Sequence, residues 1–176
     1  MAETDISLMW FRADLRLSDN PGFFRASAHS KCLSIFIFDD SDQITSPGSA
    51  SKLWLHHSLE SLNKSLDGNL NFYYGDSQNI IMELVDRFDI KSVYCNSVLE
   101  PKQLILEEKC NNILSEKQIE FNALNAQTLW HPTSVLKDDG TPYKVFTPFY
   151  KRGALNAIEP RTPLSKPKKT DLLSDN

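Results

Sequence analysis

Residues 33–38 read LSIFIF, an apolar run of suitable length for one buried strand. Four other runs of similar length and character occur along the chain: ISLMWF at 6–11, LNFYY at 70–74, SVYC at 92–95 and IEFNAL at 119–124. Short apolar runs without a strict polar alternation are typical of strands that are covered on both faces. We therefore predict five buried strands.

Amphipathic segments lie between these runs and predict helices. One apolar stripe recurs at helical spacing and consists of Leu55, Leu59, Leu62 and Leu66. Its helix should begin at Ser46-Pro47, a capping residue followed by proline, and should end at Gly68. Asn20-Pro21 marks another helix start in the same way, and further stripes lie at 80–88, with Ser77 as the expected cap, and at 104–114.

This alternation of strands and helices predicts the α/β class. The expected architecture is a Rossmann-like, three-layer αβα fold around a five-stranded parallel sheet. Ligands of such folds bind outside the carboxyl ends of the strands. The functional loops should therefore be residues 12–20, 39–49, 75–76 and 96–103.

The C-terminal part of the sequence has a different character. Residues 135–146 contain Asp139-Gly140 between two short β-prone runs, which predicts a small hairpin. Residues 160–176 combine prolines and lysines without an apolar period and are expected to form a linker. The sequence thus predicts one domain over residues 1–159, a linker over 160–176, and a chain that is a fragment of a larger protein.

The composition fits one soluble globular domain, since 40% of the 176 residues are hydrophobic and 24% are charged. The formal net charge of −4 does not supply the positive field that non-specific nucleic-acid binding requires. Cys32, Cys95 and Cys110 lie in apolar runs without CxxC spacing, so we interpret them as buried, reduced thiols. The sequence shows neither a signal peptide nor a long apolar segment, which favours a cytoplasmic protein without a membrane span.

The stretch WFRADLRLSDN at residues 10–20 is the most specific motif of the chain. It resembles the opening motif WFR-x-DLR-x-x-DN of the photolyase and cryptochrome family at every fixed position. YKVFTPF at residues 143–149 is similar to a segment near the end of the α/β domain of that family. Gly75-Asp76, and Asn96 with Glu100-Pro101, also lie where family members have similar residues, so the resemblance spans about residues 6–153.

The resemblance implies a function and cofactors. This chain would be the N-terminal light-harvesting domain of an enzyme most like a bacterial deoxyribodipyrimidine photolyase, a carbon–carbon lyase that repairs pyrimidine dimers in DNA. An antenna pigment bound here would pass excitation to FAD in a C-terminal helical domain, which would also contact the damaged DNA. The isolated fragment would be a monomer without photorepair and without catalytic residues of its own, because its task is to position the pigment.

Two other functions remain open at this point. A cryptochrome blue-light receptor has the same N-terminal domain, and the residues that would distinguish it lie outside this sequence. A stand-alone nucleotide-binding α/β domain is disfavoured, because the sequence lacks both G-x-G-x-x-G and the P-loop motif.

Arg12 and Asp14 follow the first strand and are the first candidates for pigment binding. We expect both side chains to face the cleft, where the guanidinium can pair with an anionic group of the ligand. The alternative is a structural role in which Asp14 pairs with Arg16, and Asp19 or Asn20 caps the next helix.

Four further residues are candidates through the resemblance. Asp39 would border the pigment pocket, and Lys52 would approach a flavin-type pigment, although a solvated surface lysine is the alternative. Glu100 and Gln103 follow the fourth strand, and relatives that bind a reduced folate have an acidic side chain at the position of Gln103. A neutral amide loses that charge-assisted contact, so 8-hydroxy-deazaflavin or FMN is favoured over methenyltetrahydrofolate.

The histidines and two of the tryptophans are interpreted as structural. His56 and His57 are adjacent, and on a helix they diverge too far for the i, i+4 pair that a metal site uses, so we predict no metal. Trp54 and Trp130 are expected to form packing contacts or pocket walls, because the tryptophans that transfer electrons in the family belong to its other domain.

Overall fold

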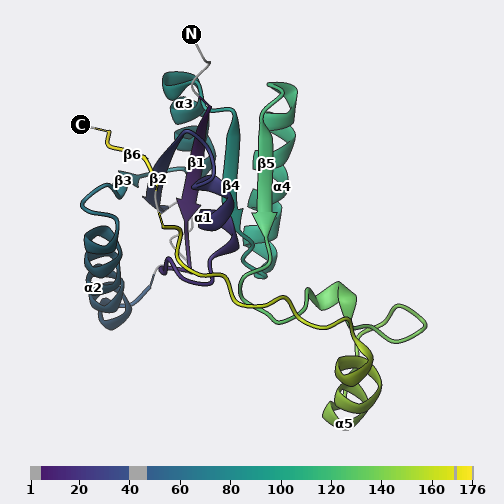
Figure 1. Ribbon diagram of the computed structural model, residues 1–176. Coiled ribbons are helices and arrows are strands. Elements are labelled where there is room, and N and C mark those ends of the chain that lie inside the picture. Colours follow the sequence, from purple (N-terminus) through teal and green to yellow (C-terminus); the bar gives the residue numbers. More distant parts are fainter. Residues whose placement is uncertain (1–4, 40–46, 169, 176) are drawn as a thin grey trace.

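A parallel β-sheet lies at the centre of the computed structural model, which describes residues 5–39, 47–168 and 170–175 (Figure 1). Its strand order is β3-β2-β1-β4-β5, so β1 lies in the middle, with β2 and β3 on one side and β4 and β5 on the other. The strands are β1 (Ile6–Phe11), β2 (Lys31–Phe38), β3 (Asn71–Tyr74), β4 (Ser92–Asn96) and β5 (Glu120–Leu124). The helices between them are α1 (Pro21–Ala26), α2 (Ser49–Ser65), α3 (Ser77–Phe88) and α4 (Pro101–Glu116). The five predicted strands and their parallel arrangement are confirmed.

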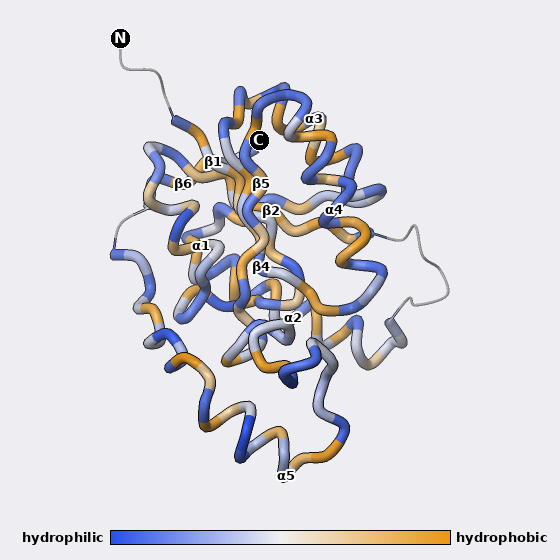
Figure 2. Tube along the Cα trace, turned by 90° about the vertical axis from the view of Figure 1, so that its right-hand side faces the viewer, coloured by the Kyte–Doolittle hydropathy of each residue, from blue (hydrophilic) through white to orange (hydrophobic). Residues whose placement is uncertain are grey.

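Alternate residues of β1 build two separate hydrophobic cores, one on each face of the sheet. Leu8 and Trp10 pack in a cluster that includes residues of α3 and α4. Met9 and Phe11 pack in the other cluster, with residues of α1 and α2. Because neighbouring side chains of a strand point to opposite faces and both faces are covered, the run ISLMWF is apolar except for Ser7, whose hydroxyl donates to the carbonyl of Ala26 at 2.8 Å. Figure 2 shows this gathering of hydrophobic residues in the central strands. The predicted three-layer αβα arrangement is therefore confirmed.

The helix starts confirm one predicted cap and correct two. Asn20 caps α1, since its side chain accepts a hydrogen bond from the backbone N–H of Phe23 at 2.9 Å. Helix α3 is capped by Asp76 instead of the predicted Ser77, because the Asp76 carboxylate reaches the N–H of Asn79 at 2.9 Å. Helix α2 begins at Ser49 with Gly48 as its N-cap, two residues after Pro47, and the predicted cap Ser46 lies outside the described residues.

The C-terminal segment returns to the sheet, which corrects the prediction that residues 160–176 are only a linker. Leu172 and Leu173 form β6, a sixth strand that pairs with Cys32 and Leu33 of β2. The pairing is possible because β3 contacts β2 only from Ile35 onward, which leaves the first part of β2 without a neighbour on that side. We call residues 161–168 and 170–175 the strap. The predicted end of the domain at residue 159 stays a prediction.

Residues 125–158 project from the body of the domain, and we call them the arm (Figure 1). Residues 135–146, all of them described, form no strand, so the predicted hairpin is wrong. The Asp139-Gly140 turn does form, with the N–H of Lys137 donating to the carbonyl of Thr141 at 2.9 Å. The pairing stops there because the Thr141 N–H donates to the Asp139 carboxylate at 2.9 Å instead of across the turn to Lys137.

Short helical segments make up the rest of the arm. They are a 3₁₀ turn at Pro132–Ser134, helix α5 at Phe146–Pro148, a π-helical turn at Phe149–Gly153 and a 3₁₀ turn at Ala154–Asn156. Within the described ranges, no helix is both long enough and apolar enough to cross a membrane.

Candidate functional site

A buried polar network joins the loops that follow β1 and β4. Asn96, the last residue of β4, donates from its amide nitrogen to the Asp14 carboxylate and, at 2.7 Å, to the side-chain oxygen of Asn20. Its amide oxygen accepts the backbone N–H of Gly22 at 2.9 Å. Asp14 also accepts from the Asn20 side chain at 3.0 Å and from the N–H of Arg12 at 3.2 Å. This network holds the loop after β1 against the end of β4, at the carboxyl edge of these two neighbouring strands.

Asp14 is only 2% exposed, and its carboxylate accepts from this network, whereas Arg16 donates only its backbone N–H to the Asp14 carbonyl, at 2.6 Å. Arg16 donates instead to the carbonyl oxygens of Asp19 and Ala126, at 3.0 and 2.9 Å. Asp14 therefore holds two loops together, and its contact with a pigment stays a prediction.

Arg12 lies at the centre of a second cluster and is also buried. Its Nη2 donates to the Glu107 carboxylate at 2.5 Å and to the carbonyl of Asn96 at 2.6 Å, and Nη1 donates to the Gln103 oxygen at 3.4 Å. The guanidinium also lies 4.6 Å from the centroid of the Trp10 ring. Because Glu107 already balances its charge, Arg12 needs no anionic ligand to be stable inside the protein.

A cavity of about 610 Å³ opens beside this cluster, between the loop after β1 and one face of α2. The loop contributes Arg12, Ala13 and Leu15, and α2 contributes Trp54, Leu55, His57, Ser58 and Ser61. A smaller cavity of about 230 Å³ adjoins it, shares Leu15 and Ser61, and is closed on one side by Lys166 of the strap. The larger volume falls in the range that holds small-molecule ligands, and its walls combine an indole and aliphatic groups with a few polar side chains.

The predicted site residues do not all lie at this cavity. Arg12 lines it, and Gln103 contacts Arg12 from α4. Asp39 is exposed and its carboxylate accepts the N–H of Ser77 at 3.0 Å, so it supports the start of α3. Lys52 and Glu100 are exposed, in the first turn of α2 and directly before α4. A role for Asp39, Lys52 and Glu100 in pigment binding therefore stays a prediction.

Sequence reasoning missed Glu107, which is buried and completes the Arg12 cluster. Its carboxylate also accepts the hydroxyl of Ser97 at 2.8 Å and the N–H of Val98 at 3.0 Å. One signal was present in the sequence, because Glu107 falls on the same helical stripe as the buried residues Cys110 and Leu114. An acidic residue on a buried stripe indicates a buried partner of opposite charge.

The three cysteines are unreactive thiols, and two adjacent histidines lie closer together than expected. All three cysteines are buried and free, as predicted, and burial raises the pKa of the Cys32 and Cys110 thiols to about 11 and that of Cys95 to about 12. They are therefore protonated at neutral pH. The expectation that His56 and His57 diverge is corrected, because their ring centroids lie 5.3 Å apart and their ligand atoms and that of Glu60 lie within 4.8 Å of one another. All three residues are exposed, and the absence of a metal site stays a prediction.

The DNA photolyase family matches residues 7–168 of the chain. The chain belongs to this family. Its sequence is 31% identical to the deoxyribodipyrimidine photo-lyase of Agrobacterium fabrum over 166 residues, which cover 92% of the chain and 34% of that enzyme. It is 27% identical to cryptochrome-1 of Arabidopsis thaliana, over 93% of the chain and 25% of that protein. This photolyase-family chain thus spans about a third of the length of the curated photo-lyase that it matches.

Solved structures agree with this assignment. A class III photolyase of Agrobacterium tumefaciens superposes with a TM-score of 0.89 at 28% identity and covers all of the chain and 38% of its own length. An archaeal photolyase of Sulfolobus tokodaii, determined with two FAD molecules, gives a TM-score of 0.78 at 25% identity. It covers 97% of this chain and 38% of its own. The family resemblance read from residues 10–20 and 143–149 is therefore confirmed.

Proposed function

We propose that this domain harvests light for a deoxyribodipyrimidine photo-lyase, by holding an antenna pigment in the cavity between the loop after β1 and helix α2. The single observation that carries the proposal is the 610 Å³ cavity, which has Trp54 and Arg12 in its walls and lies beside the fixed carboxyl edge of the sheet. Open α/β sheets bind ligands at this edge. A bound pigment of this kind supplies absorption of light, and the protein supplies its position and orientation.

The residues present suit a flat, conjugated ring. Trp54 is 78% exposed, so its indole face is free to stack on a ligand ring. Ser58 and Ser61 offer hydroxyl groups and His57 an imidazole to the polar edge of such a ring. The buried Asp14–Asn20–Asn96 network keeps the facing loop rigid, which fixes the orientation that energy transfer requires.

The proposed pigment is FMN or 8-hydroxy-deazaflavin, with methenyltetrahydrofolate as the alternative. Gln103 is neutral and already accepts from Arg12, so it offers a folate no charged contact. The Arg12 charge is neutralised by Glu107, which favours a ligand that needs hydrogen bonds more than a strong ion pair.

The whole protein is proposed to repair pyrimidine dimers in DNA, with FAD and the DNA contacts in a further helical domain and with this fragment inactive alone. The identity to the Agrobacterium photo-lyase, 31% against 27% for the plant cryptochrome, favours the repair enzyme over a blue-light receptor. We also propose that the whole protein is a monomer located in the cytoplasm.

Pigment binding is tested by titrating the purified chain with FMN, 8-hydroxy-deazaflavin and methenyltetrahydrofolate in turn and following their fluorescence. We expect FMN to be quenched on binding, and Trp54→Ala to weaken binding about tenfold, since stacking on an aromatic ring contributes about 1–3 kcal/mol. Trp130→Ala is the matched control, because Trp130 lies on the arm and donates to the carbonyl of Ile158 at 2.6 Å. No binding of any pigment at tens of micromolar would overturn the proposal.

A further inference from the structure

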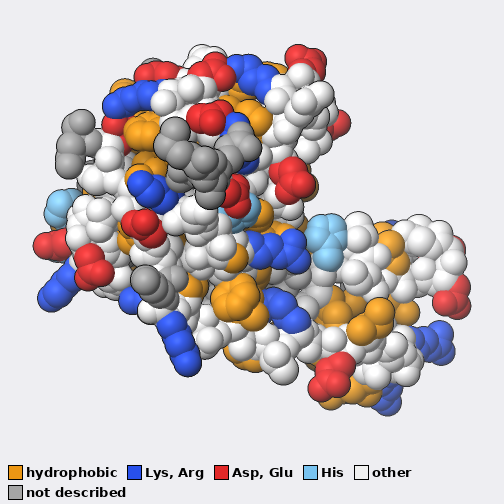
Figure 3. Space-filling model, turned by 45° about the horizontal axis from the view of Figure 1, so that its top comes forward, with side chains coloured by type: hydrophobic (Ala, Val, Ile, Leu, Met, Phe, Trp, Pro, Cys, Tyr) orange, Lys and Arg blue, Asp and Glu red, His pale blue; other side chains and the backbone are white. Residues whose placement is uncertain are grey.

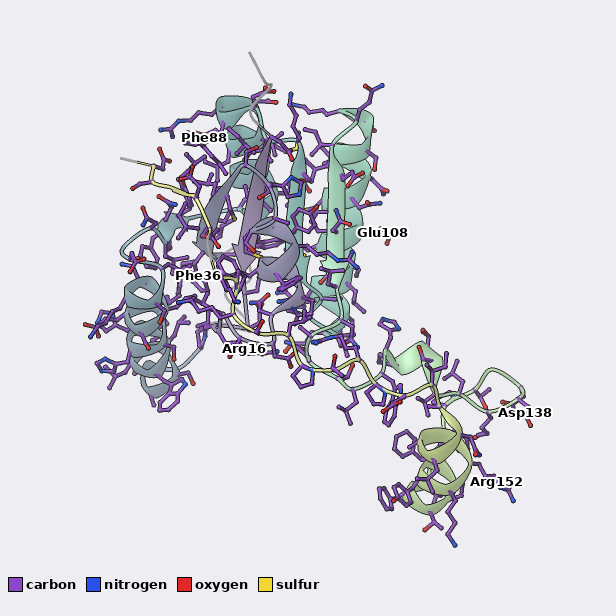
Figure 4. The ribbon with its side chains drawn as sticks, viewed as in Figure 1. Arg16, Phe36, Phe88, Glu108, Asp138 and Arg152 are labelled. Carbon is purple, nitrogen blue, oxygen red and sulfur yellow. The ribbon has the colours of Figure 1, made fainter. Side chains whose placement is uncertain are left out.

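Helix α2 lies at the side of the domain and is mostly exposed. Only Leu62 of its 17 residues is buried. Figure 3 shows charged side chains of both signs interspersed over the body of the domain, and Figure 4 shows many side chains of α2 pointing away from the sheet. Because the formal net charge of the chain is −4, it has no overall positive field that would repel a cation from this helix.

Three potential metal ligands lie together on α2. His56, His57 and Glu60 each offer one ligand atom, and these atoms all lie within 4.8 Å of one another. Nδ1 of His57 is 3.5 Å from a carboxylate oxygen of Glu60. Glu60 follows His56 by four residues and His57 by three, so it lies beside both histidines on the helix surface. In the described parts of the chain, no other three histidine, cysteine, aspartate or glutamate side chains are grouped in this way.

This ligand set suits Zn²⁺. Two imidazole nitrogens and a carboxylate oxygen are ligands that zinc uses, with water in the fourth position. Bonds of about 2.0–2.1 Å in a tetrahedral site place the ligand atoms about 3.3 Å apart, so the side chains must close by at most about 1.5 Å. The side chains of His57 and Glu60 are 64% and 72% exposed and can rotate without moving the helix. Lys52 and Lys64, one helical turn away on either side, are also exposed, so solvent screens their charges.

Other side chains of the described chain that could compete for the ion are less suitable. All three cysteines are buried and carry protonated thiols, because burial raises their pKa values. The ring of His29 is held by the Asp5 carboxylate at 2.6 Å and by the Tyr94 hydroxyl at 2.9 Å. His131 lies on the arm, away from the other histidines. The cluster on α2 is therefore the best site for a borderline cation such as zinc.

We infer that His56, His57 and Glu60 form a Zn²⁺ site on the outer surface of α2. The sequence predicted no metal site because adjacent histidines diverge on a helix, and the structure removes that reason, since both rings lie within reach of Glu60. The inference goes beyond the proposed function and does not depend on a bound pigment. His57 also lines the 610 Å³ cavity, so the ion would lie at the wall of that cavity. Zinc on Nδ1 of His57 would leave the proton on Nε2, which makes this nitrogen a hydrogen-bond donor.

Calorimetric titration tests the site. The complete chain is treated with a chelator, dialysed and titrated with zinc chloride. We expect one equivalent of zinc to bind with a dissociation constant on the order of 10 μM, because exposed ligands bind more weakly than those of a closed structural site. His57→Ala and Glu60→Gln should each weaken binding at least about tenfold. His131→Ala is the matched control, because His131 is an exposed histidine outside the cluster, and it should leave binding unchanged.

Proton NMR adds a measurement that identifies the ligands. Zinc should shift the imidazole resonances of two of the four histidines, His56 and His57, whereas Mg²⁺, which prefers oxygen ligands, should shift none. Circular dichroism should show unchanged helix content in each variant, because the replaced side chains are exposed. Undiminished zinc binding in His57→Ala, shifts at His29 or His131 instead, or no binding at millimolar zinc would overturn the inference. These measurements omit the pigment, so a failure of pigment binding is recognised separately.

Discussion

The Arg12 guanidinium and the Glu107 carboxylate form an ion pair of 2.5 Å between the loop after β1 and α4, and only 8% and 9% of the two side chains are exposed. A pair this deeply buried is stable only while both partners are present, because either charge alone has lost its hydration. The same carboxylate binds the loop at Ser97 and Val98. Glu107 thus links the wall of the proposed pigment cavity to the loop after β4.

Replacing Glu107 should therefore destabilise the domain strongly. We expect Glu107→Gln to lower the free energy of unfolding by about 3 kcal/mol, since it leaves the Arg12 charge buried without a partner. For a domain of this size the melting temperature should fall by about 10 °C. Glu108→Gln is the matched control because Glu108 is the exposed neighbour on the same helix, and it should change the melting temperature by less than about 2 °C. Equal falls in melting temperature for the two substitutions would show that losing the buried ion pair destabilises the domain no more than losing an exposed carboxylate.

The close approach of α1 to β4 leads to a second prediction. A Cβ atom on Gly22 would lie 3.0 Å from the Asn96 side-chain oxygen and 3.2 Å from the backbone carbon of Cys95. Gly22→Ala should lower the free energy of unfolding by about 1–3 kcal/mol, because backbone atoms cannot move aside without disturbing the sheet. Gly48→Ala has nothing within 4 Å of the new atom, so it should cost only the loss of a glycine N-cap, about 0.5–1 kcal/mol. Urea denaturation of both variants decides whether crowding at Gly22 is the cause.

The sequence predicted the sheet well because each buried strand has its own local signal. The runs at 6–11 and 33–38 are apolar apart from Ser7 and Ser34, a composition that is typical of strands covered on both faces. Strand β6 has no such signal, since it consists of Leu172 and Leu173 between polar neighbours. Its place is decided by the late start of β3, a tertiary feature that no local pattern encodes.

The candidate site was only partly predictable for a similar reason. The motif at residues 10–20 identified Arg12 as a candidate site residue. It could not identify the residues that bind the Arg12 guanidinium, because these depend on which helix packs on that face of the sheet. Glu107 lies 95 residues further along the chain and faces Arg12 because α4 covers this face. The hairpin prediction failed beyond the Asp139-Gly140 turn. The short-range turn signal was correct, but the Thr141 N–H donates to the Asp139 carboxylate and the two flanking runs do not pair.

Tyr73 leads to a prediction on pH. Desolvation, followed by its hydrogen bond to the Asp175 carboxylate at 2.6 Å, raises the pKa of Tyr73 above its ordinary value of 10.0. A group with a raised pKa in the folded state contributes stability that is fully present below the unfolded pKa and is lost as the pH rises above it. Tyr73 should therefore add to a loss of stability above about pH 10, a window in which the three buried thiols with raised pKa values contribute as well. Tyr73→Phe should make the loss above about pH 10 less steep, and an unchanged slope in the variant would assign the loss to the thiols alone.

The attachment of the strap provides the last prediction. Asp175 accepts hydrogen bonds from Tyr73 and from both terminal nitrogens of Arg87, and only 10% of its side chain is exposed. Its backbone N–H also donates to the Asn71 side chain at 2.7 Å, beside the pairing of β6 with β2. Asp175→Asn keeps the shape but loses the charge, so the end of the strap should detach more often, at a cost of about 1–2 kcal/mol.

Amide hydrogen exchange at Cys32 reports this detachment, because its N–H donates to the carbonyl of Asp171 in the strap at 2.8 Å. We expect exchange at Cys32 to accelerate about tenfold in Asp175→Asn, since about 1.4 kcal/mol corresponds to a factor of ten in an opening equilibrium. Exchange at Trp10 in the centre of the sheet should stay unchanged. Asp171→Asn is the matched control, because its exposed side chain leaves the backbone carbonyl in place. Unchanged exchange at Cys32 in Asp175→Asn would mean that the leucines of β6 alone hold the strap on the sheet.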